Sequence, residues 1–354
     1  MTEYPVELVL DSGAYSCWKR QETLDLNKYI EFIEKWREYI FYPVNLDVIP
    51  GSFGRVPSDA VVEASAKQGW ENLQTMRAAG IDAMPVFHQG EQRYWLEKMI
   101  GEGYDYIGIS PANDRTTKQK SVWLDEIFGY LCGKKGYPAI RTHGFGVTSL
   151  PLLFRYPWFS ADSATWFLIG AYGGIMVPVA ASDGSRDFTK SPHTIQLSNR
   201  ERASTLSMQH CVHYENMGDE MRKYIDRYLG DEEFDLAELR SSYKKREKVN
   251  CRFFKRVTEV HTPKPFRPAV RGFFSNFHDS KEGQSEPWGK MRIIFTINTS
   301  QEHSDTLTDE KVRERLISYY YFKDRSPWDM DNYVKTGRIP LKGTKKSKPQ
   351  KSKL

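Results

Sequence analysis

The stretch LVLDSGAYSCW, Leu8–Trp18, sets the pattern from which the fold can be predicted. An apolar segment, Val6–Leu10, runs directly into Asp11, Ser12 and Gly13. A short apolar run bounded by Asp, Ser and Gly is typical of a strand that enters a turn. An acid at the end of a buried strand is either a cap for that turn or a catalytic group, because burying a charge is costly.

The same strand-and-turn unit recurs through the first half of the chain. We expect strands at 6–10, 42–48, 83–87, 104–109, 139–142, 158–161 and 174–179, and helices at 25–40, 58–79, 91–101, 120–133, 150–155 and 165–169. An eighth apolar segment, MRIIFTIN, lies at Met291–Asn298. Such alternation predicts an α/β protein with a parallel sheet, and eight strands predict a TIM-type (β/α)8 barrel. An open doubly wound sheet is the alternative, with weak support because no GxGxxG follows the first strand.

Composition limits the class of protein. Hydrophobic residues make up 39% and aromatic residues 14%, which is enough for a packed core. No apolar run approaches the roughly 18 residues that span a bilayer, and the first residues lack a basic-then-apolar signal pattern. The four cysteines are scattered without a CxxC pair. We therefore expect a cytoplasmic protein with no membrane partner and no disulfide framework.

The net charge of +5 is unevenly distributed. Eight of the 51 Lys and Arg lie after Val334 and no acid does, so the residues before it carry 43 basic against 46 acidic groups. The Lys, Ser and Pro content of 335–354 predicts a disordered tail, which is either a solubilising terminus or an arm for a polyanion. The predicted domains are a barrel core at 1–182, a helical basic insertion at 183–290, the last strand and helix at 291–334, and the tail.

A second basic segment, RSSYKKREKVNCRFFKR, covers Arg240–Arg256. It has eight Lys or Arg against one Glu, with three aromatic residues between them. Cations suit phosphates and flat rings suit exposed bases, so this segment is the candidate nucleic-acid surface. The alternative is a solvated helix face. The candidate contacts are Lys244, Lys245, Arg246, Lys248, Arg252, Lys255 and Arg256.

Polar residues follow most of the predicted strands. The strand ends carry Asp11-Ser12-Gly13, Asp47, His88-Gln89-Gly90, Gly108-Ile109-Ser110, His143–Gly146 and Asp162-Ser163. The carboxyl ends of barrel strands meet on one face, so three acids and two histidines predict a pocket there. Asp11 and Asp162 can face each other across it. Paired carboxylates suit glycosyl transfer, in which one attacks the sugar and the other moves a proton.

Six short motifs resemble the tRNA-guanine transglycosylase superfamily, whose members are TIM barrels. In chain order they are LDSGAYS, VNLDVIP, VFHQGE, YIGIS, GFGVTS and WFSADSATW, over residues 6–166. The resemblance implies that Asp162 is the nucleophile and Asp11 the general base. It further implies a binding site for the substrate base formed by Ser12, Asp47, Gln89, Gly90, Gly108, His143 and Phe145. His143 can equally be a structural histidine.

The departures from this family are informative. The CxCxxC…H zinc motif is absent, and its weak substitutes are Cys211, His213 and Cys251. We therefore expect no cofactor, with zinc as the less favoured alternative. The RNA-binding domains that the archaeal enzymes of this family add to the barrel are also absent. These losses resemble the DpdA-like enzymes of phages and bacteria, which exchange guanine in DNA for a 7-deazaguanine such as preQ0.

The expected function is therefore DNA-guanine transglycosylation. The expected partners are DNA and a free 7-deazaguanine base, with a homodimer as a further possibility. Four alternatives stay open. They are a tRNA transglycosylase, an N-glycosylase that lets water finish the reaction, a non-catalytic binding barrel, and an unrelated carbohydrate enzyme.

Overall fold

A computed structural model describes residues 9–52, 54–112, 115–147, 149–198, 211–267, 283–293 and 297–298. Its helices are α1 (Ala14–Arg20), α2 (Leu26–Lys35), α3 (Asp59–Ala78), α4 (Arg93–Gly101), α5 (Thr117–Cys132), α6 (Leu150–Arg155), α7 (Thr165–Ala171), α8 (Asp219–Asp231), α9 (Leu236–Ser241) and α10 (Tyr243–Val260). Its strands are β1 (Val9–Asp11), β2 (Tyr42–Pro43), β3 (Val86–His88), β4 (Tyr106–Ser110), β5 (Arg141–Gly144), β6 (Ser160–Ala161), β7 (Gly174–Val177), β8 (Val179–Ala180), β9 (Arg186–Asp187), β10 (His193–Gln196), β11 (Val212–His213), β12 (Arg292–Ile293) and β13 (Ile297–Asn298). The Lys-rich tail, 335–354, and the helix predicted before it lie outside the described residues.

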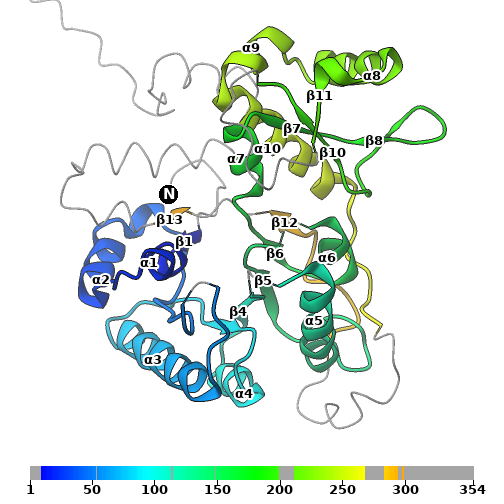
Figure 1. The fold of residues 1–354 in the computed structure, drawn as a ribbon. Coiled ribbons are helices and arrows are strands. Elements are labelled where there is room, and N and C mark those ends of the chain that lie inside the picture. The colour runs from blue at the N-terminus through cyan, green and yellow to red at the C-terminus, as the bar shows by residue number, and fades with distance from the viewer. Residues whose placement is uncertain are drawn as a thin grey trace, which may run out of the picture.

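Parallel pairing organises the first half of the chain (Figure 1). The strands β3, β4, β5 and β6 pair in chain order, and β12 lies beside β6. The strand β1 lies between β2 and β13, and a parallel bridge from Val44 to Met84 links the β2 and β3 segments. The chain is therefore a mixed α/β protein with several parallel strands, as predicted. Because the strands are parallel, their carboxyl ends point the same way.

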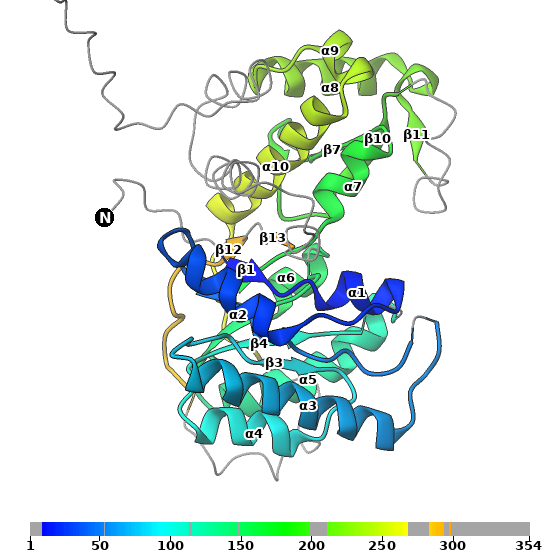
Figure 2. The ribbon, with the colours of Figure 1, turned by 90° about the vertical axis from the view of Figure 1, so that its left-hand side faces the viewer.

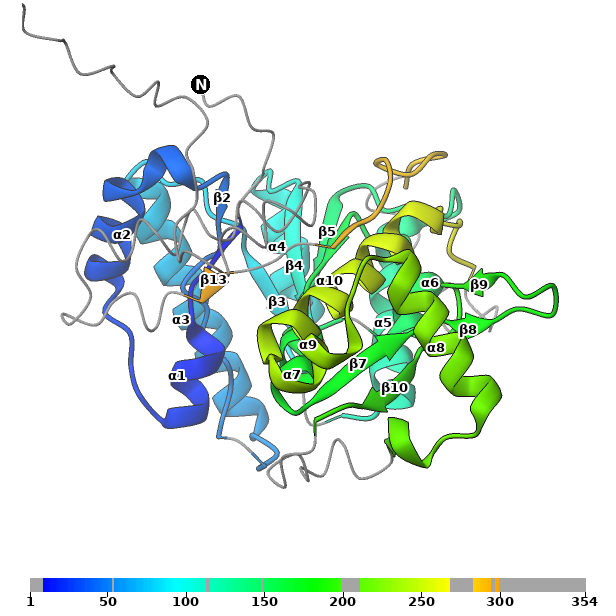
Figure 3. The same cartoon turned by 90° about the horizontal axis from the view of Figure 1, so that it is seen from above.

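Helices cover these strands on two sides. In Figure 3, α1, α2 and α3 lie on one side of β3, β4 and β5, and α5 and α6 lie on the other. The side chains of Tyr29, Phe128 and Trp158 are fully buried between the layers. Within the described ranges, none of the helices has the length and apolar character needed to cross a bilayer.

Local sequence sets the helix ends. Asp25 accepts hydrogen bonds from the N–H groups of Asn27 and Lys28 and so caps α2. Thr116 and Gln119 form a capping box at the start of α5. The helix α3 ends at Ala78, and Gly80, two residues further on, adopts a φ of 75°.

The prediction for the strand at 174–179 is wrong about the strands that it pairs with. The strand was expected to continue the parallel sheet, but β7 pairs antiparallel with β10, and β10 pairs parallel with β11. The three form a separate sheet. The segment is apolar enough for either sheet, and hydrophobicity alone does not select its partner.

The predicted boundary at residue 182 also falls inside a structural unit. It lies between β8 and β9, which form an antiparallel pair, and β7 before it shares a sheet with β10 after it. The helix α7 packs against α10, so the unit that carries the basic helix begins at α7. Figure 2 shows this unit of α7–α10 above the parallel strands.

The helices α7 and α10 approach each other closely at Gly170, which predicts that a larger side chain there destabilises the fold. A Cβ atom at Gly170 would lie 2.9 Å from both the backbone nitrogen and the Cγ of Glu247. We expect Gly170→Ala to lower the free energy of unfolding by about 1–3 kcal/mol, because backbone must move. Urea unfolding monitored by circular dichroism measures this.

The matched control is Gly230→Ala in α8, where a Cβ atom would meet nothing within 4 Å. It should raise stability by about 0.5–1 kcal/mol, as alanine is the better helix former. Equal changes in the free energy of unfolding for Gly170→Ala and Gly230→Ala would contradict the close contact between α7 and α10.

Candidate active site

The carboxyl groups of Asp11 and Asp162 line one pocket of about 680 Å³. Asp11 is the last residue of β1, and Asp162 directly follows β6. Their parallel strands bring both residues to the carboxyl ends, as the sequence predicted. Asp47 and Phe145 line the same pocket. Its volume lies within the roughly 300–1,000 Å³ of ordinary ligand sites.

The carboxyl group of Asp11 holds a proton near neutral pH. Desolvation is the main cause, and the negative charges of Asp162 and Asp47 add to it, so the pKa of Asp11 rises to about 8. Hydrogen bonds from the backbone of Gly13 and Ser12 offset part of the rise. Gly13 adopts a φ of 79°, which lets α1 begin directly after the strand. This site therefore contains one neutral acid beside two further carboxyl groups.

Asp162 accepts a hydrogen bond from the backbone and lies near a buried histidine. The N–H of Gly146 donates to Asp162 Oδ1 at 2.9 Å, and His143 Nε2 lies 3.7 Å from the same oxygen. His143 is fully buried, and its Nδ1 hydrogen-bonds with the hydroxyl of Ser160 at 2.8 Å. The hydroxyl of Tyr106 reaches the same serine at 2.6 Å. The predicted role of His143 in base binding is therefore not observed, because the ring lies behind Asp162 and does not line the pocket.

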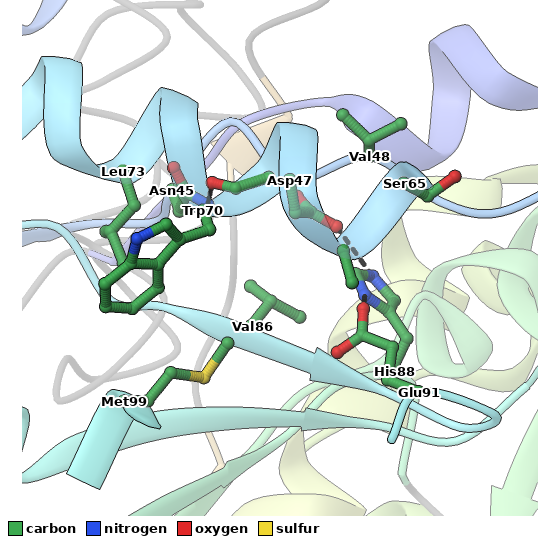
Figure 4. A pocket seen from close by; sticks show the side chains of 12 residues that line it. Asn45, Asp47, Val48, Ser65, Trp70, Leu73, Val86, His88, Glu91 and Met99 are labelled. Carbon is green, nitrogen blue, oxygen red and sulfur yellow. Dashed lines mark hydrogen bonds and ion pairs between the residues drawn. The ribbon is translucent and has the colours of Figure 1, made fainter. Parts of the chain in front are cut away.

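Asp47 is the centre of a second polar network, of which Figure 4 shows the part formed with His88 and Glu91. The hydroxyl of Ser12 donates to Asp47 Oδ1 at 3.1 Å, and His88 Nε2 lies 2.8 Å from Oδ2. His88 Nδ1 lies 3.0 Å from Oε1 of Glu91. Burial of the His88 ring opposes protonation, but the bonds to Asp47 and Glu91 outweigh it and raise the pKa of His88 to about 10. Ser12 thus supports Asp47 and does not itself line the pocket.

Gly108 and Phe145 lie against each other. A Cβ atom at Gly108 would lie 2.3 Å from Cε2 of Phe145, so the glycine makes room for the ring. Phe145 is half-buried, and its ring meets that of His143 edge-on at 4.4 Å. Gly108 thus acts through its lack of a side chain, which places Phe145 on the pocket wall.

Gln89 and Gly90 do not reach this pocket. They line an adjoining pocket of about 440 Å³, which shares Tyr15, Ile49 and Ser110 with the first. The side-chain oxygen of Gln89 accepts a hydrogen bond from the N–H of Ala112. Of the predicted base-binding residues, Asp47 and Phe145 therefore line the main pocket, and Gln89 and Gly90 line the adjoining one.

Sequence reasoning missed several residues that line the main pocket. They include Tyr15 and Lys19 on α1 and Trp166, Phe167 and Leu168 on α7. Tyr15 lies in the stretch that opens the sequence argument, one helical turn past Asp11. A helix that starts directly after a strand has its first turn at the carboxyl end of that strand. This position could have predicted that Tyr15 lines the pocket.

The predicted nucleic-acid surface is only partly at the surface. Arg246 and Lys248 are buried, with 4% and 6% of their surface exposed. Arg246 donates to the backbone carbonyls of Gly170 and Leu239, so the surface role predicted for these two cations is wrong. Arg246 lies against α7, as its bond to Gly170 shows.

The other candidates on α10 are more accessible, but most are paired. Arg252 and Arg256 both form ion pairs with Glu232, and Lys245 pairs with Glu238. Lys244 and Lys255 are exposed.

The zinc set of the resembling family does not fit this chain. In the part of the chain that the structure describes, no group of three or more His, Cys, Asp or Glu side chains is arranged to hold a metal ion. Cys251 is buried in α10, and His213 Nδ1 accepts a hydrogen bond from the N–H of Glu215. The chain matches no protein-family model, no curated protein and no solved structure.

Proposed function

We propose that this protein is a DNA-guanine transglycosylase that exchanges guanine in DNA for a free 7-deazaguanine such as preQ0. The observation that carries the proposal is the pairing of Asp11 and Asp162 in one pocket, where Asp11 has a pKa of about 8. One carboxyl group can attack the sugar while the other gives and takes a proton.

We further propose that the parallel strands close into a TIM-type barrel. The segment 291–298 supports this, because its first part pairs with β6 and its last part pairs with β1. In such a barrel this segment takes the place next to β6 that the sequence argument gave to 174–179. The catalytic face is then the one that carries Asp11 and Asp162.

In the first step, Asp162 attacks C1′ of the target deoxyguanosine and the glycosidic bond breaks. Asp11 donates its proton to the departing guanine, so the base leaves neutral and Asp11 becomes a carboxylate. The products are free guanine and a covalent ester between Asp162 and the deoxyribose. The hydrogen bond from the N–H of Gly146 fixes one carboxylate oxygen of Asp162 during this attack.

In the second step, a free 7-deazaguanine enters the same pocket. The Asp11 carboxylate takes the N9 proton, and N9 attacks C1′ to release Asp162. Two displacements at one carbon retain its configuration. Asp11 ends protonated, so both carboxyl groups return to their starting states without a redox reaction.

The pocket walls suit a purine. Asp47 offers carboxylate oxygens to N–H donors on the base edge, and Phe145 offers a ring face. Tyr15 adds a second aromatic side chain, 37% exposed, on the α1 wall. Lys19 brings a cation to the same wall, where a strand phosphate would pass.

The preference for DNA over tRNA rests on the sequence resemblance. The exposed side chains of Lys244 and Lys255 on α10 are the remaining candidates for backbone contacts in the predicted cluster. Nucleoside mass spectrometry of DNA and tRNA, from a bacterium that makes preQ0 and expresses this chain, tests the assignment. A 7-deazaguanine deoxynucleoside in DNA supports it. Modification in tRNA alone, or abasic sites in DNA, would instead favour the tRNA enzyme or the N-glycosylase.

The contact between Gly108 and Phe145 predicts a binding defect. We expect Gly108→Ala to weaken binding of preQ0 by roughly 10-fold, because the new Cβ atom displaces the ring that lies against the purine. Isothermal titration with the free base measures this.

The matched control is Gly101→Ala in α4, where a Cβ atom would meet nothing within 4 Å. It should bind preQ0 as the wild type does. If Gly108→Ala also leaves the affinity unchanged, Phe145 does not contact the base.

A further inference from the structure

The imidazole of His88 lies between two carboxyl groups in a buried site. Its nitrogens are 2.8 Å from Asp47 Oδ2 and 3.0 Å from Glu91 Oε1. The side chains of His88, Asp47 and Glu91 are only 7%, 10% and 3% exposed. A neutral imidazole carries one N–H and can donate to only one of the two oxygens. An imidazolium can donate to both, and the hydrogen bonds to Asp47 and Glu91 raise the pKa of His88 to about 10.

We propose that His88 and Glu91 are positioning residues that keep Asp47 ionised and fixed, so that Asp47 accepts hydrogen bonds only from a base with N–H donors on its edge. The inference rests on the proposed function, since it concerns how that pocket distinguishes a guanine-type from an adenine-type base. Neither residue contacts the base in this arrangement.

The bonds already made by Asp47 define what remains for a ligand. A carboxylate has about four lone-pair sites. Ser12 occupies one on Oδ1 and His88 one on Oδ2, so each oxygen keeps one site, and Asp47 lines the main pocket. Two parallel acceptors match adjacent N–H groups, such as N1–H and the amino group of a guanine-type base. An adenine-type edge presents an acceptor at N1, which an ionised carboxylate repels.

The charges around Asp47 explain why a cation is needed. The ionisable groups near it are Asp11 on β1, Tyr29 on α2, His88 and Glu91, and Asp162 acts through Asp11. Three clustered acids do not all ionise without a counter-charge. His88 supplies that charge next to Asp47 and not next to Asp11. The proton of the cluster therefore resides on Asp11, where the chemistry needs it.

Removing the cation has a defined pH signature. Without His88, Asp47 takes up a proton more readily as the pH falls, and a protonated carboxyl group no longer offers two acceptors. The binding defect should then be largest at low pH and should shrink as the pH rises. A purely structural loss would weaken binding equally at every pH.

The experiment is isothermal titration of the full-length protein with preQ0 and with 7-cyano-7-deazaadenine at pH 6, 7.5 and 9. We expect His88→Gln to bind preQ0 roughly 10-fold more weakly than the wild type at pH 6, with a ratio approaching one at pH 9. Discrimination against the adenine analogue should fall by a similar factor. Glu91→Gln keeps the imidazole in place. It should lower the affinity for preQ0 and the discrimination against the adenine analogue, but by smaller factors than His88→Gln. His193→Gln, an exposed histidine on β10, is the matched control.

A double-mutant cycle assigns the effect to Asp47. In an Asp47→Asn background, His88→Gln should cause no further loss, because the group that it supports is already gone. Additive losses, or a defect in His88→Gln that is the same at all three pH values, would overturn the inference. Wild-type affinity in both His88→Gln and Glu91→Gln would also overturn it. Failure of the proposed function looks different, since the wild type would then bind neither base or would bind both alike.

Discussion

The variant Asp162→Asn should retain the fold and the binding of preQ0 but lose base exchange by at least about 10⁴-fold. An amide has the shape of the carboxylate but is not a nucleophile toward C1′. The hydrogen bond from Gly146 to Oδ1 can persist, because an amide oxygen also accepts. The loss should therefore appear in the chemical step and not in the affinity for the free base.

The measurement that separates these steps is trapping of the covalent intermediate. Wild-type protein incubated with guanine-containing DNA and no free base should form an adduct that survives denaturing electrophoresis. Asp162→Asn should form none. The control is Asp82→Asn, an exposed aspartate that does not line the pocket, which should behave as the wild type. An adduct in Asp162→Asn would show that another residue attacks the sugar.

The order of strands explains why much of this site was predictable. Asp11, Asp47 and Asp162 each follow an apolar segment that the sequence predicts as a parallel strand, and such strands end on one side. The three acids were therefore placed together before any side chain was located. Phe145 was found in the same way, since it directly follows β5.

The parts that were missed depend on contacts between distant segments. The partner of His88 is Asp47, 41 residues away, and no local pattern joins them. The contact between His88 and Glu91 could have been predicted, because Glu91 lies only three residues after His88. His88 was placed at the predicted pocket by its position at a strand end, but it was given no role in binding the base.

The basic helix α10 was misread for a related reason. A run of Lys and Arg predicts a solvated face only when one side of the helix is open. Here α7, α9 and β7 all pack against α10, and both Arg246 and Lys248 are buried. The long stems of these side chains pack well, and buried carbonyls accept from the guanidinium of Arg246.

The burial of Asp11 also has a consequence for stability. Its pKa is 3.8 in a model peptide and about 8 in the folded protein. Between these values the folded state holds a proton that the unfolded state releases, so this group's contribution to stability falls as the pH rises from about 4 to about 8. The variant Asp11→Asn lacks this pH-dependent contribution to the free energy of unfolding. Its free energy of unfolding, relative to that of the wild type, should therefore increase across that range.

The second large effect expected concerns the proton of Asp11. In single-turnover release of guanine from DNA, the wild-type rate should be constant at low pH and should fall as the pH rises through about 8, because only the protonated acid can protonate the leaving base. Asp11→Asn should reduce the plateau by roughly 10²–10⁴-fold and remove this pH dependence.

The variant Asp47→Asn tests the cause of that pH dependence. The negative charge of Asp47 helps to raise the pKa of Asp11, so its removal should move the inflection in the guanine-release profile to lower pH. Base binding should weaken in the same variant, but a single-turnover rate at saturating DNA separates the two effects. A rate that rises with pH through 8 would mean that Asp11 acts as a base in the first step. An unchanged inflection in Asp47→Asn would mean that desolvation and the charge of Asp162 keep the proton on Asp11 without help from Asp47.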